Sequence, residues 1–236
     1  MSLQLWKSEG ENIRKFRSFR GNIIILEGLI GVGKTTLGYS LEAYLNQIGL
    51  SAKFFPEFKN VGLLKQYIND MKRYAYTFQI AMLMARLEIY RQADAFAKTG
   101  GISIIDRSLP GDYTFAKMQK EQHRFTNDEW LVYKRLIPLN LSEPNCIVML
   151  NCDPIVAFER MKTRGEKSEI SGYTLEYFQQ LNTYYQQTFN DISHPIIIID
   201  WNKSRQCIVD GSNVNRFLDI ETCQYVLNAI WKKLYL

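Results

Sequence analysis

Five short apolar runs recur along the chain, and each consists almost entirely of β-branched, aliphatic or aromatic residues. They are IIIL at 23–26, AKFF at 52–55, ISII at 102–105, CIVML at 146–150 and PIIII at 195–199. Strands that are apolar on both faces are typical of a parallel sheet that helices cover on both sides. We therefore predict five buried strands.

Longer segments with helical periodicity lie between these runs. We predict helices over 35–48, over 61–98 in two pieces, over 112–140 in two pieces, over 153–189 with a break, and near 218–234. Strands that alternate with helices of this length predict an α/β fold with a five-stranded parallel sheet flanked by helices. The polar stretch 200–217 predicts a long loop before the last helix.

The length of 236 residues and the 46% apolar composition fit one compact domain, which we place at 21–236. Residues 1–20 carry an excess of basic side chains, at Lys7, Arg14, Lys15, Arg17 and Arg20, and we expect a loosely ordered basic extension. A mitochondrial presequence is the alternative, but Glu9 and Glu11 argue against it.

Composition excludes several other classes of protein. The apolar runs are too short to span a bilayer, and no secretory signal is visible, so we predict a cytoplasmic protein with no membrane partner. The net charge of +5 is modest and fits small anionic ligands, so we expect no nucleic-acid partner. The four cysteines and two histidines show no metal-ligand spacing.

The sequence GLIGVGKTT at 28–36 matches the phosphate-binding pattern GxxxxGK[ST] and stands between a predicted strand and a predicted helix. Backbone N–H groups of such a loop face phosphate oxygens, the lysine reaches the outer phosphates, and the hydroxyl after it binds Mg²⁺. We assign phosphate binding to Gly28, Gly31, Gly33, Lys34, Thr35 and Thr36, with Thr35 also a metal ligand.

The use made of the nucleotide depends on residues outside this loop. A guanine-reading switch needs an Asn-Lys-x-Asp sequence, and the nearest stretch, NKSR at 202–205, lacks the aspartate. Phosphoryl transfer to a small acceptor needs a positioning carboxylate, positive charge around the moving phosphoryl group and exclusion of water. The sequence therefore favours a P-loop kinase.

Several further stretches, in this order, resemble the deoxynucleoside kinase family, which includes deoxycytidine, deoxyguanosine and mitochondrial thymidine kinases. After the P-loop come FFPE at 54–57, YTFQIAMLMAR at 76–86, IIDRSLPGDYTFAK at 104–117, NDEWLVYKRL at 127–136, and RMKTRGEKSE with YTLEYFQQLN at 160–182. The resemblance covers roughly residues 20 to 200. It implies an enzyme that phosphorylates the 5′-hydroxyl of a deoxynucleoside with ATP or another NTP and Mg²⁺, and it implies a homodimer.

The resemblance also implies a catalytic group at the carboxyl edge of the sheet. Glu57 corresponds to the residue that accepts the proton of the sugar 5′-hydroxyl. Asp106 follows the third strand, and we assign it to Mg²⁺, although the base role could belong to this residue instead. Arg107 would lie between the two substrates and offset negative charge, and Lys34 completes the catalytic set.

A second group of residues is expected to bind the nucleoside. Gln79 and Arg86 lie on one face of the predicted helix together with Met82, and a glutamine amide suits the edge of a base. Asp112 resembles the partner of Arg86, in a segment one residue shorter than in relatives. This pair indicates deoxycytidine or a purine deoxynucleoside. Phe115 is either the aromatic residue stacked on the base or a core residue.

The segment RGEKSEISG at 164–172 is expected to be either a solvated loop or a short, arginine-bearing mobile lid. Arg160 and Arg164 resemble the arginines that close over the phosphates. The third arginine of relatives is replaced here by Glu166, with Lys167 beside it. Tyr67, at a one-residue offset, and Glu169 resemble the residues that bind the sugar 3′-hydroxyl.

Two rival functions remain open. A nucleoside monophosphate kinase such as thymidylate kinase shares the fold and the P-loop, but its acceptor phosphate usually needs further arginines near the second strand, where this chain has Glu57 and Lys59. A regulatory nucleotide-binding protein without catalysis is the other rival, and in such a protein Glu57 would be dispensable.

Overall fold

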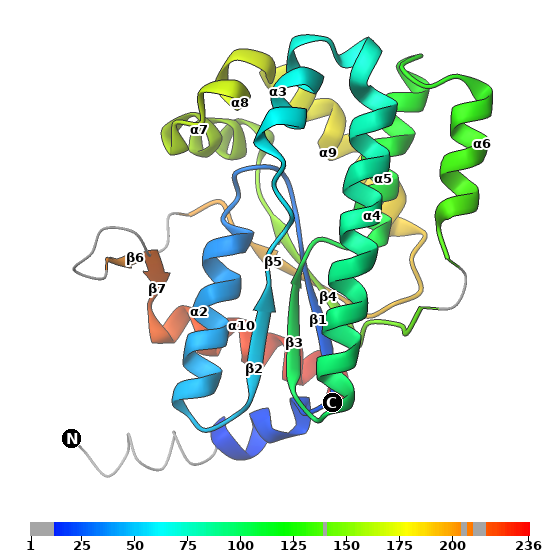
Figure 1. Ribbon diagram of the computed structural model, residues 1–236. Coiled ribbons are helices and arrows are strands. Elements are labelled where there is room, and N and C mark those ends of the chain that lie inside the picture. Colours follow the sequence, from blue (N-terminus) through cyan, green and yellow to red (C-terminus); the bar gives the residue numbers. More distant parts are fainter. Residues whose placement is uncertain (1–11, 139–140, 204–206, 210–215) are drawn as a thin grey trace.

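The computed structural model describes residues 12–138, 141–203, 207–209 and 216–236. A parallel five-stranded sheet with the order β2-β3-β1-β4-β5 runs through the molecule, as the sequence predicts (Figure 1). Its strands are β1 (Ile23–Glu27), β2 (Ala52–Phe55), β3 (Ile102–Asp106), β4 (Cys146–Asn151) and β5 (Ile196–Asp200). Because the strands are parallel, all their carboxyl ends lie at one edge of the sheet, where open α/β folds bind ligands.

Helices cover the sheet on both sides, with α2 and α10 on one side and α4 on the other (Figure 1). In chain order they are α2 (Lys34–Gln47), α3 (Val61–Asn69), α4 (Met71–Lys98), α5 (Leu109–Glu121), α6 (Asn127–Leu136), α7 (Pro154–Arg164), α8 (Lys167–Gly172), α9 (Leu175–Asn190) and α10 (Ile220–Tyr235). Local capping explains several starts. Ser108 accepts the amide of Gly111 at the start of α5, and Thr126 forms a capping box with Glu129 at the start of α6.

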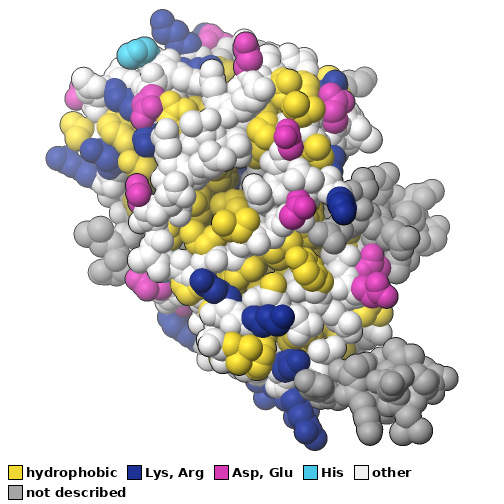
Figure 2. Space-filling view, turned by 180° about the vertical axis from the view of Figure 1, so that it is seen from behind, with side chains coloured by type: hydrophobic (Ala, Val, Ile, Leu, Met, Phe, Trp, Pro, Cys, Tyr) yellow, Lys and Arg dark blue, Asp and Glu magenta, His cyan; other side chains and the backbone are white. Residues whose placement is uncertain are grey.

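The surface seen from behind carries charges of both signs. Figure 2 shows Lys and Arg side chains in small separate groups on this face, with Asp and Glu side chains between them. No helix in the described part of the chain is long and apolar enough to cross a membrane.

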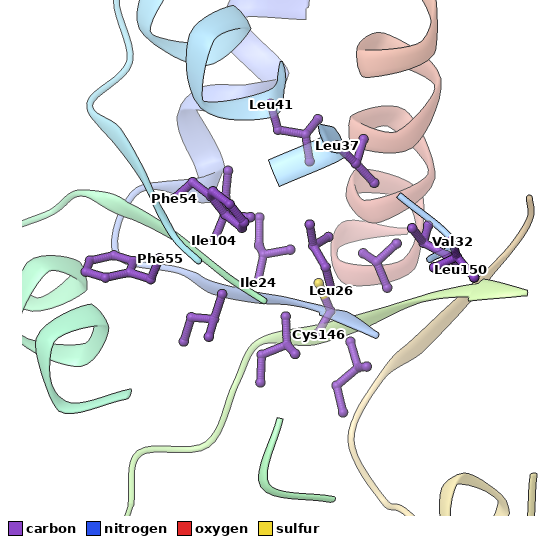
Figure 3. Packing of buried hydrophobic residues seen from close by; sticks show 14 of the residues in the cluster. Ile24, Leu26, Val32, Leu37, Leu41, Phe54, Phe55, Ile104, Cys146 and Leu150 are labelled. Carbon is purple, nitrogen blue, oxygen red and sulfur yellow. The ribbon is translucent and has the colours of Figure 1, made fainter. Parts of the chain in front are cut away.

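The core lies where α2 packs on the centre of the sheet (Figure 3). Leu37 and Leu41 of α2 are fully buried, as are Ile24 and Leu26 of β1. At Gly38, a Cβ atom would lie 2.2 Å from the ring of Phe54, so the helix can approach β2 only without a side chain there. This packing fixes the start of α2, and with it the phosphate loop, against the carboxyl end of β1.

The amino-terminal segment differs from the expected loose extension. Residues 12–16 are helical, Arg17–Phe19 form the 3₁₀ helix η1, and the side chains of Phe16 and Phe19 are fully buried. Phe19 also packs against Tyr235 at the end of α10. Two large aromatic side chains bury enough apolar surface to order this segment, an effect that the basic composition concealed. Residues 1–11 of the extension lie outside the described residues.

Two segments predicted as irregular contain regular structure. Within 164–172, the left-handed Gly165 ends α7, and the short helix α8 follows at once. Within 200–217, Cys207–Val209 (β6) and Arg216–Leu218 (β7) pair as antiparallel strands beside α2. Both elements are shorter than the windows in which periodicity can be recognised, which is why the sequence pattern missed them.

If Phe19 belongs to the core, Phe19→Ala should lower the free energy of unfolding by about 3–5 kcal/mol, the usual cost of removing a buried phenylalanine side chain. Urea unfolding followed by circular dichroism measures the change. Phe58→Ala is the matched control, because the Phe58 side chain is 44% exposed and its loss should change stability by about 0.5 kcal/mol or less. Equal effects of the two substitutions would contradict the placement of Phe19 in the core.

Candidate active site

A cleft of about 870 Å³ opens at the carboxyl ends of the strands. The phosphate loop, the segment after β2, one face of α4, and Phe115 and Gln119 of α5 form its walls, and α7, α8 and α9 contribute from above. Most residues that the sequence singled out line this cleft: Gly31, Gly33, Lys34, Thr35, Thr36, Glu57, Tyr67, Gln79, Met82, Arg86, Asp106, Arg107, Phe115, Arg160, Arg164 and Glu169.

The phosphate loop has the backbone that its glycines predict. Gly33 adopts a left-handed conformation with φ 105° at the start of α2, and Gly31 has φ 79° with no room for a Cβ atom beside Ala157 O, 2.9 Å away. The Nζ of Lys34 donates to the carbonyl oxygens of Gly28 at 3.1 Å and Leu29 at 2.8 Å. Lys34 is thereby held inside the loop.

The electrostatic surroundings of Lys34 change the pKa of its ammonium group. Burial, followed by the charge of Arg107, lowers the pKa of the Lys34 ammonium from 10.5 to about 8. A group of phosphates placed in the loop would favour the charged form and raise this pKa again. The lysine is therefore sensitive to the charge of whatever occupies the loop.

Thr35 and Asp106 together can hold a divalent cation. The Thr35 Oγ1 donates to Oδ2 of Asp106 at 2.8 Å, and Oδ1 of Asp106 is buried without a hydrogen-bond partner among the described residues. Burial raises the pKa of the Asp106 carboxyl because it disfavours the charged form. A bound cation would stabilise the carboxylate and lower this pKa again. No group of three or more His, Cys, Asp or Glu residues that could hold a metal exists in the described part, but Mg²⁺ needs only one or two carboxylates when phosphates complete its shell.

Glu57 lies between two arginines at the opening of the cleft. Its carboxylate accepts hydrogen bonds from Nη2 of Arg86 and from Nε of Arg107, the latter at 3.1 Å, and 22% of the side chain is exposed. Burial alone raises the pKa of Glu57, but the surrounding cations, Arg107 first, outweigh burial and lower the pKa to about 2. The carboxylate is therefore ionised at neutral pH.

Arg107 connects this carboxylate with the phosphate loop. Its Nη1 donates to Gly28 O at 3.1 Å, and its guanidinium lies 5.1 Å from the centre of the Phe115 ring. The residue has φ 74°, a left-handed backbone conformation that is uncommon for residues other than glycine and asparagine. Its surroundings must therefore hold it there. Such strain is frequent at functional sites.

Asp112 organises the far wall of the cleft. It is fully buried, pairs with Nη1 of Arg86, and accepts hydrogen bonds from Gln79 Nε2 at 2.8 Å and Tyr133 OH at 2.7 Å. Arg86 thus bridges Asp112 and Glu57. The structure places Gln79, Arg86 and Asp112 together, as the sequence predicts, despite the shortened segment. Met82 lies on the same wall.

Tyr67, Arg160 and Arg164 bond to other residues of the protein. The Tyr67 hydroxyl accepts a hydrogen bond from Gln119 and also bonds Tyr177, and the Tyr67 ring stacks on Phe78 at 4.7 Å. In the lid, Arg164 pairs with Glu169. Arg160, expected over the phosphates, donates to the carbonyl oxygens of Trp201 and Asn202 at 2.8 and 2.9 Å, because these carbonyls end β5 beside α7. The side chain of Lys167 lies outside the described residues.

Three residues of the site were missed by sequence reasoning. Glu27, at the end of β1, is fully buried and bonds Ser108, and Tyr185 of α9 bonds both Glu27 and Arg107. Trp201 lines the cleft after β5, with its indole nitrogen 3.7 Å from the Cβ position of Gly33. A charged residue directly after four apolar strand residues was the available signal for Glu27, whereas Tyr185 left no distinguishing pattern.

Comparisons with known proteins agree with this geometry. The model of the family described as deoxynucleoside kinase matches residues 24–222. A deoxyadenosine kinase of Dictyostelium discoideum is 34% identical over 198 residues, which cover 81% of this chain and 77% of the relative. A deoxyguanosine kinase of Lactobacillus acidophilus is 28% identical, with 77% of this chain and 81% of the relative covered. A thymidylate kinase of Francisella tularensis is 24% identical over 76% of this chain and 88% of its own.

Solved structures share the fold. The structure of a deoxyadenosine kinase from M. mycoides with bound dATP has a TM-score of 0.66 and 24% identity, and it covers 87% of this chain and 96% of its own. The same kinase with bound dCTP has a TM-score of 0.64. At this level of identity the likeness concerns the fold.

The lowered pKa of Lys34 predicts how triphosphate binding depends on pH. Below pH 8 the ammonium is already charged and the affinity should be constant; above pH 8 binding must take up a proton, so the affinity should fall by up to about tenfold per pH unit. Titration calorimetry with Mg·ATP between pH 7 and 9.5 measures this. Lys34→Met should bind weakly and lose the dependence. An unchanged affinity across pH 8 in the unmodified protein would contradict the prediction.

Proposed function

Because the chain belongs to the deoxynucleoside kinase family, we propose that it transfers the γ-phosphate of ATP or another NTP to the 5′-hydroxyl of a deoxynucleoside in nucleotide salvage. The family match covers most of the chain and establishes a phosphotransferase that acts on a deoxynucleoside hydroxyl. The donor, the metal, the preferred base and the role of each residue are our proposals.

The observation that carries the proposal is an ionised carboxylate with two arginines, in the same cleft as the phosphate loop. Glu57 can accept a hydrogen bond from the sugar hydroxyl and orient its oxygen toward the γ-phosphorus. With a pKa of about 2, Glu57 is a weak base. A bound triphosphate adds negative charge beside Arg107, which offsets the cations and raises the pKa of Glu57 toward a useful value.

We assign a separate role in phosphoryl transfer to each of the remaining groups of the cleft. Lys34 and the loop amides hold the donor phosphates, and Arg107 offsets charge on the group in transfer. Thr35 and Asp106 would hold Mg²⁺, which when bound supplies positive charge between the outer phosphates. We assign Asp106 to Mg²⁺ rather than to the base role because its carboxylate lies against the Thr35 hydroxyl of the phosphate loop, where the metal is expected. Arg160 and Arg164 line the cleft from α7, and Arg164 at the start of the lid would contribute charge toward the phosphates.

The acceptor pocket favours a base with both donor and acceptor groups. Gln79 offers an amide, and Arg86 is held by Asp112 in a fixed orientation. These residues support deoxycytidine or a purine deoxynucleoside, and two relatives bear the names deoxyadenosine and deoxyguanosine kinase. Phe115, near Arg107, would flank the base, and Tyr67 and Glu169 would contact the sugar.

We expect a homodimer that works in the cytoplasm, without nucleic-acid or membrane partners. Apolar side chains are exposed on two helices, at Met84 of α4 and at Leu131, Val132 and Leu136 of α6, with 37–48% of each exposed. Where such side chains form a contiguous patch, they mark a surface that a partner covers. The mixed charges of the rear face give no continuous basic surface there (Figure 2).

The rival monophosphate kinase finds less support. Beyond Glu57, the cleft residues after β2 are Phe58, Lys59 and Asn60, which offer no arginine to an acceptor phosphate. Thymidylate kinases match this chain at lower identity than the deoxyadenosine kinase does. A non-catalytic regulator would not require the paired arginines that hold Glu57.

We expect Glu57→Gln to retain Mg·ATP binding and to lower kcat by roughly 10²–10⁴-fold, because the amide cannot take the proton of the 5′-hydroxyl. The measurement is phosphorylation of deoxynucleosides, and of their monophosphates, with radiolabelled ATP. Glu166→Gln is the control, since Glu166 is an exposed glutamate of the same cleft and should leave kcat within about twofold. Product formed only from monophosphates would refute the proposed acceptor, and near-normal turnover of Glu57→Gln would refute the assigned base.

For the base preference, we expect the unmodified enzyme to show higher kcat/KM with deoxycytidine, deoxyadenosine or deoxyguanosine than with thymidine. Asp112→Asn should lower kcat/KM for the preferred nucleoside by about tenfold or more, because the carboxylate that fixes Arg86 is lost. Initial rates with the four deoxynucleosides provide the comparison. Thymidine as the best substrate, or an equal loss with all four in the variant, would contradict the role of this pair.

A further inference from the structure

Glu27 is a buried carboxylate that the reaction described above does not use. It ends β1, is fully buried, and accepts the backbone amide and the hydroxyl of Ser108, each at 2.6 Å. Gly111 has no side chain where a Cβ atom would lie 2.1 Å from Oε1 of Glu27. The end of the central strand is therefore tied to the start of α5, directly after Arg107.

Tyr185 joins this carboxylate to Arg107. Its hydroxyl donates to Oε2 of Glu27 at 3.0 Å and accepts from Nη1 of Arg107 at 2.6 Å. The buried ring stacks on Phe189 at 5.4 Å and meets Phe115 edge-on at 6.1 Å, so the hydroxyl has a fixed position. Burial raises the pKa of Tyr185 well above 10, so the hydroxyl keeps the proton that it donates.

The Tyr185 hydroxyl lies between the Arg107 guanidinium and the Glu27 carboxylate, which carry opposite charges. Nη1 of Arg107 lies 3.8 Å from Oε2 of Glu27, beyond hydrogen-bonding distance. On its other side, Nε of Arg107 donates to Glu57. Without the bridging hydroxyl, the guanidinium is free to move toward Glu27 and away from Glu57, and the left-handed backbone of Arg107 loses one of its restraints.

We propose that Tyr185 is a positioning residue for phosphoryl transfer, whose hydroxyl holds the Arg107 guanidinium between Glu27 and Glu57. This inference rests on the proposed function, since it assigns Arg107 to the transferring phosphoryl group. A structural brace between α9 and β1 is the competing interpretation. A brace predicts lost stability without a selective effect on kcat.

The first experiment compares two tyrosines that are neighbours on α9. Tyr185→Phe removes only the bridging hydroxyl, and we expect kcat to fall about ten- to hundredfold while KM for Mg·ATP changes less than about threefold. Tyr184→Phe is the matched control, because the Tyr184 hydroxyl bonds Glu121 at the surface; its kcat should change less than about twofold. Thermal unfolding of both variants is measured in parallel. Unchanged kcat in Tyr185→Phe would overturn the inference.

A double-mutant cycle then separates positioning from bracing. Arg107→Lys has no Nη1 atom for Tyr185 to hold, so adding Tyr185→Phe to it should lower the single-turnover rate by less than about twofold. If Tyr185→Phe costs the same factor with arginine or lysine at position 107, the hydroxyl does not act through Arg107, and the inference is wrong.

The two proposals fail in different ways. If the unmodified enzyme phosphorylates no deoxynucleoside, the proposed function fails before either variant is made. If it is active and the two tyrosine variants behave alike, the proposed function stands and the role of Tyr185 is refuted.

Discussion

Opposite charges buried in one cleft are the constraint on which this structure depends. Arg86 and Arg107 are almost wholly buried, and they are stable there only because carboxylates face them from several directions. Glu57 lies between them, Asp112 fixes one, and Glu27 fixes the other through Tyr185. Because these partners come from β1, α4, α5, α9 and the segment after β2, their pairing sets how the elements meet at the edge of the sheet.

The same arrangement explains why the cleft suits a polyanion. The arginines are compensated by protein carboxylates, and Lys34 has a lowered pKa because burial and Arg107 disfavour its charge. A triphosphate brings negative charge to the place where Lys34 and Arg107 meet. In the proposed reaction, this charge would raise the pKa of Lys34 and also that of Glu57, so that donor binding would prepare Glu57 to accept the proton of the sugar hydroxyl.

The sequence predicted those parts of the fold that repeat a simple pattern. The five strands are short, mainly apolar runs, and they lie within one residue of the expected bounds. The phosphate loop was recognisable because its glycines are required by backbone geometry. Phe16 and Phe19 were concealed by the basic residues around them, and α8 and the β6–β7 pair are too short for periodicity to show.

In the site, motif order located Glu57, Gln79, Arg86 and Asp112, whereas Tyr185 is identified only by its place in space. The placement of Arg160 on backbone carbonyls depends on how β5 ends, which no local pattern encodes.

The contact between α8 and α3 joins two walls of the cleft. At Gly172 a Cβ atom would lie only 1.8 Å from Ile68, so the end of α8 is seated directly on α3, the helix that carries Tyr67. Any movement of α8 away from α3 would therefore expose more of the Ile68 side chain and remove a neighbour of the helix that carries Tyr67. The position of α8 and that of the α3 wall are thus coupled through this apolar contact.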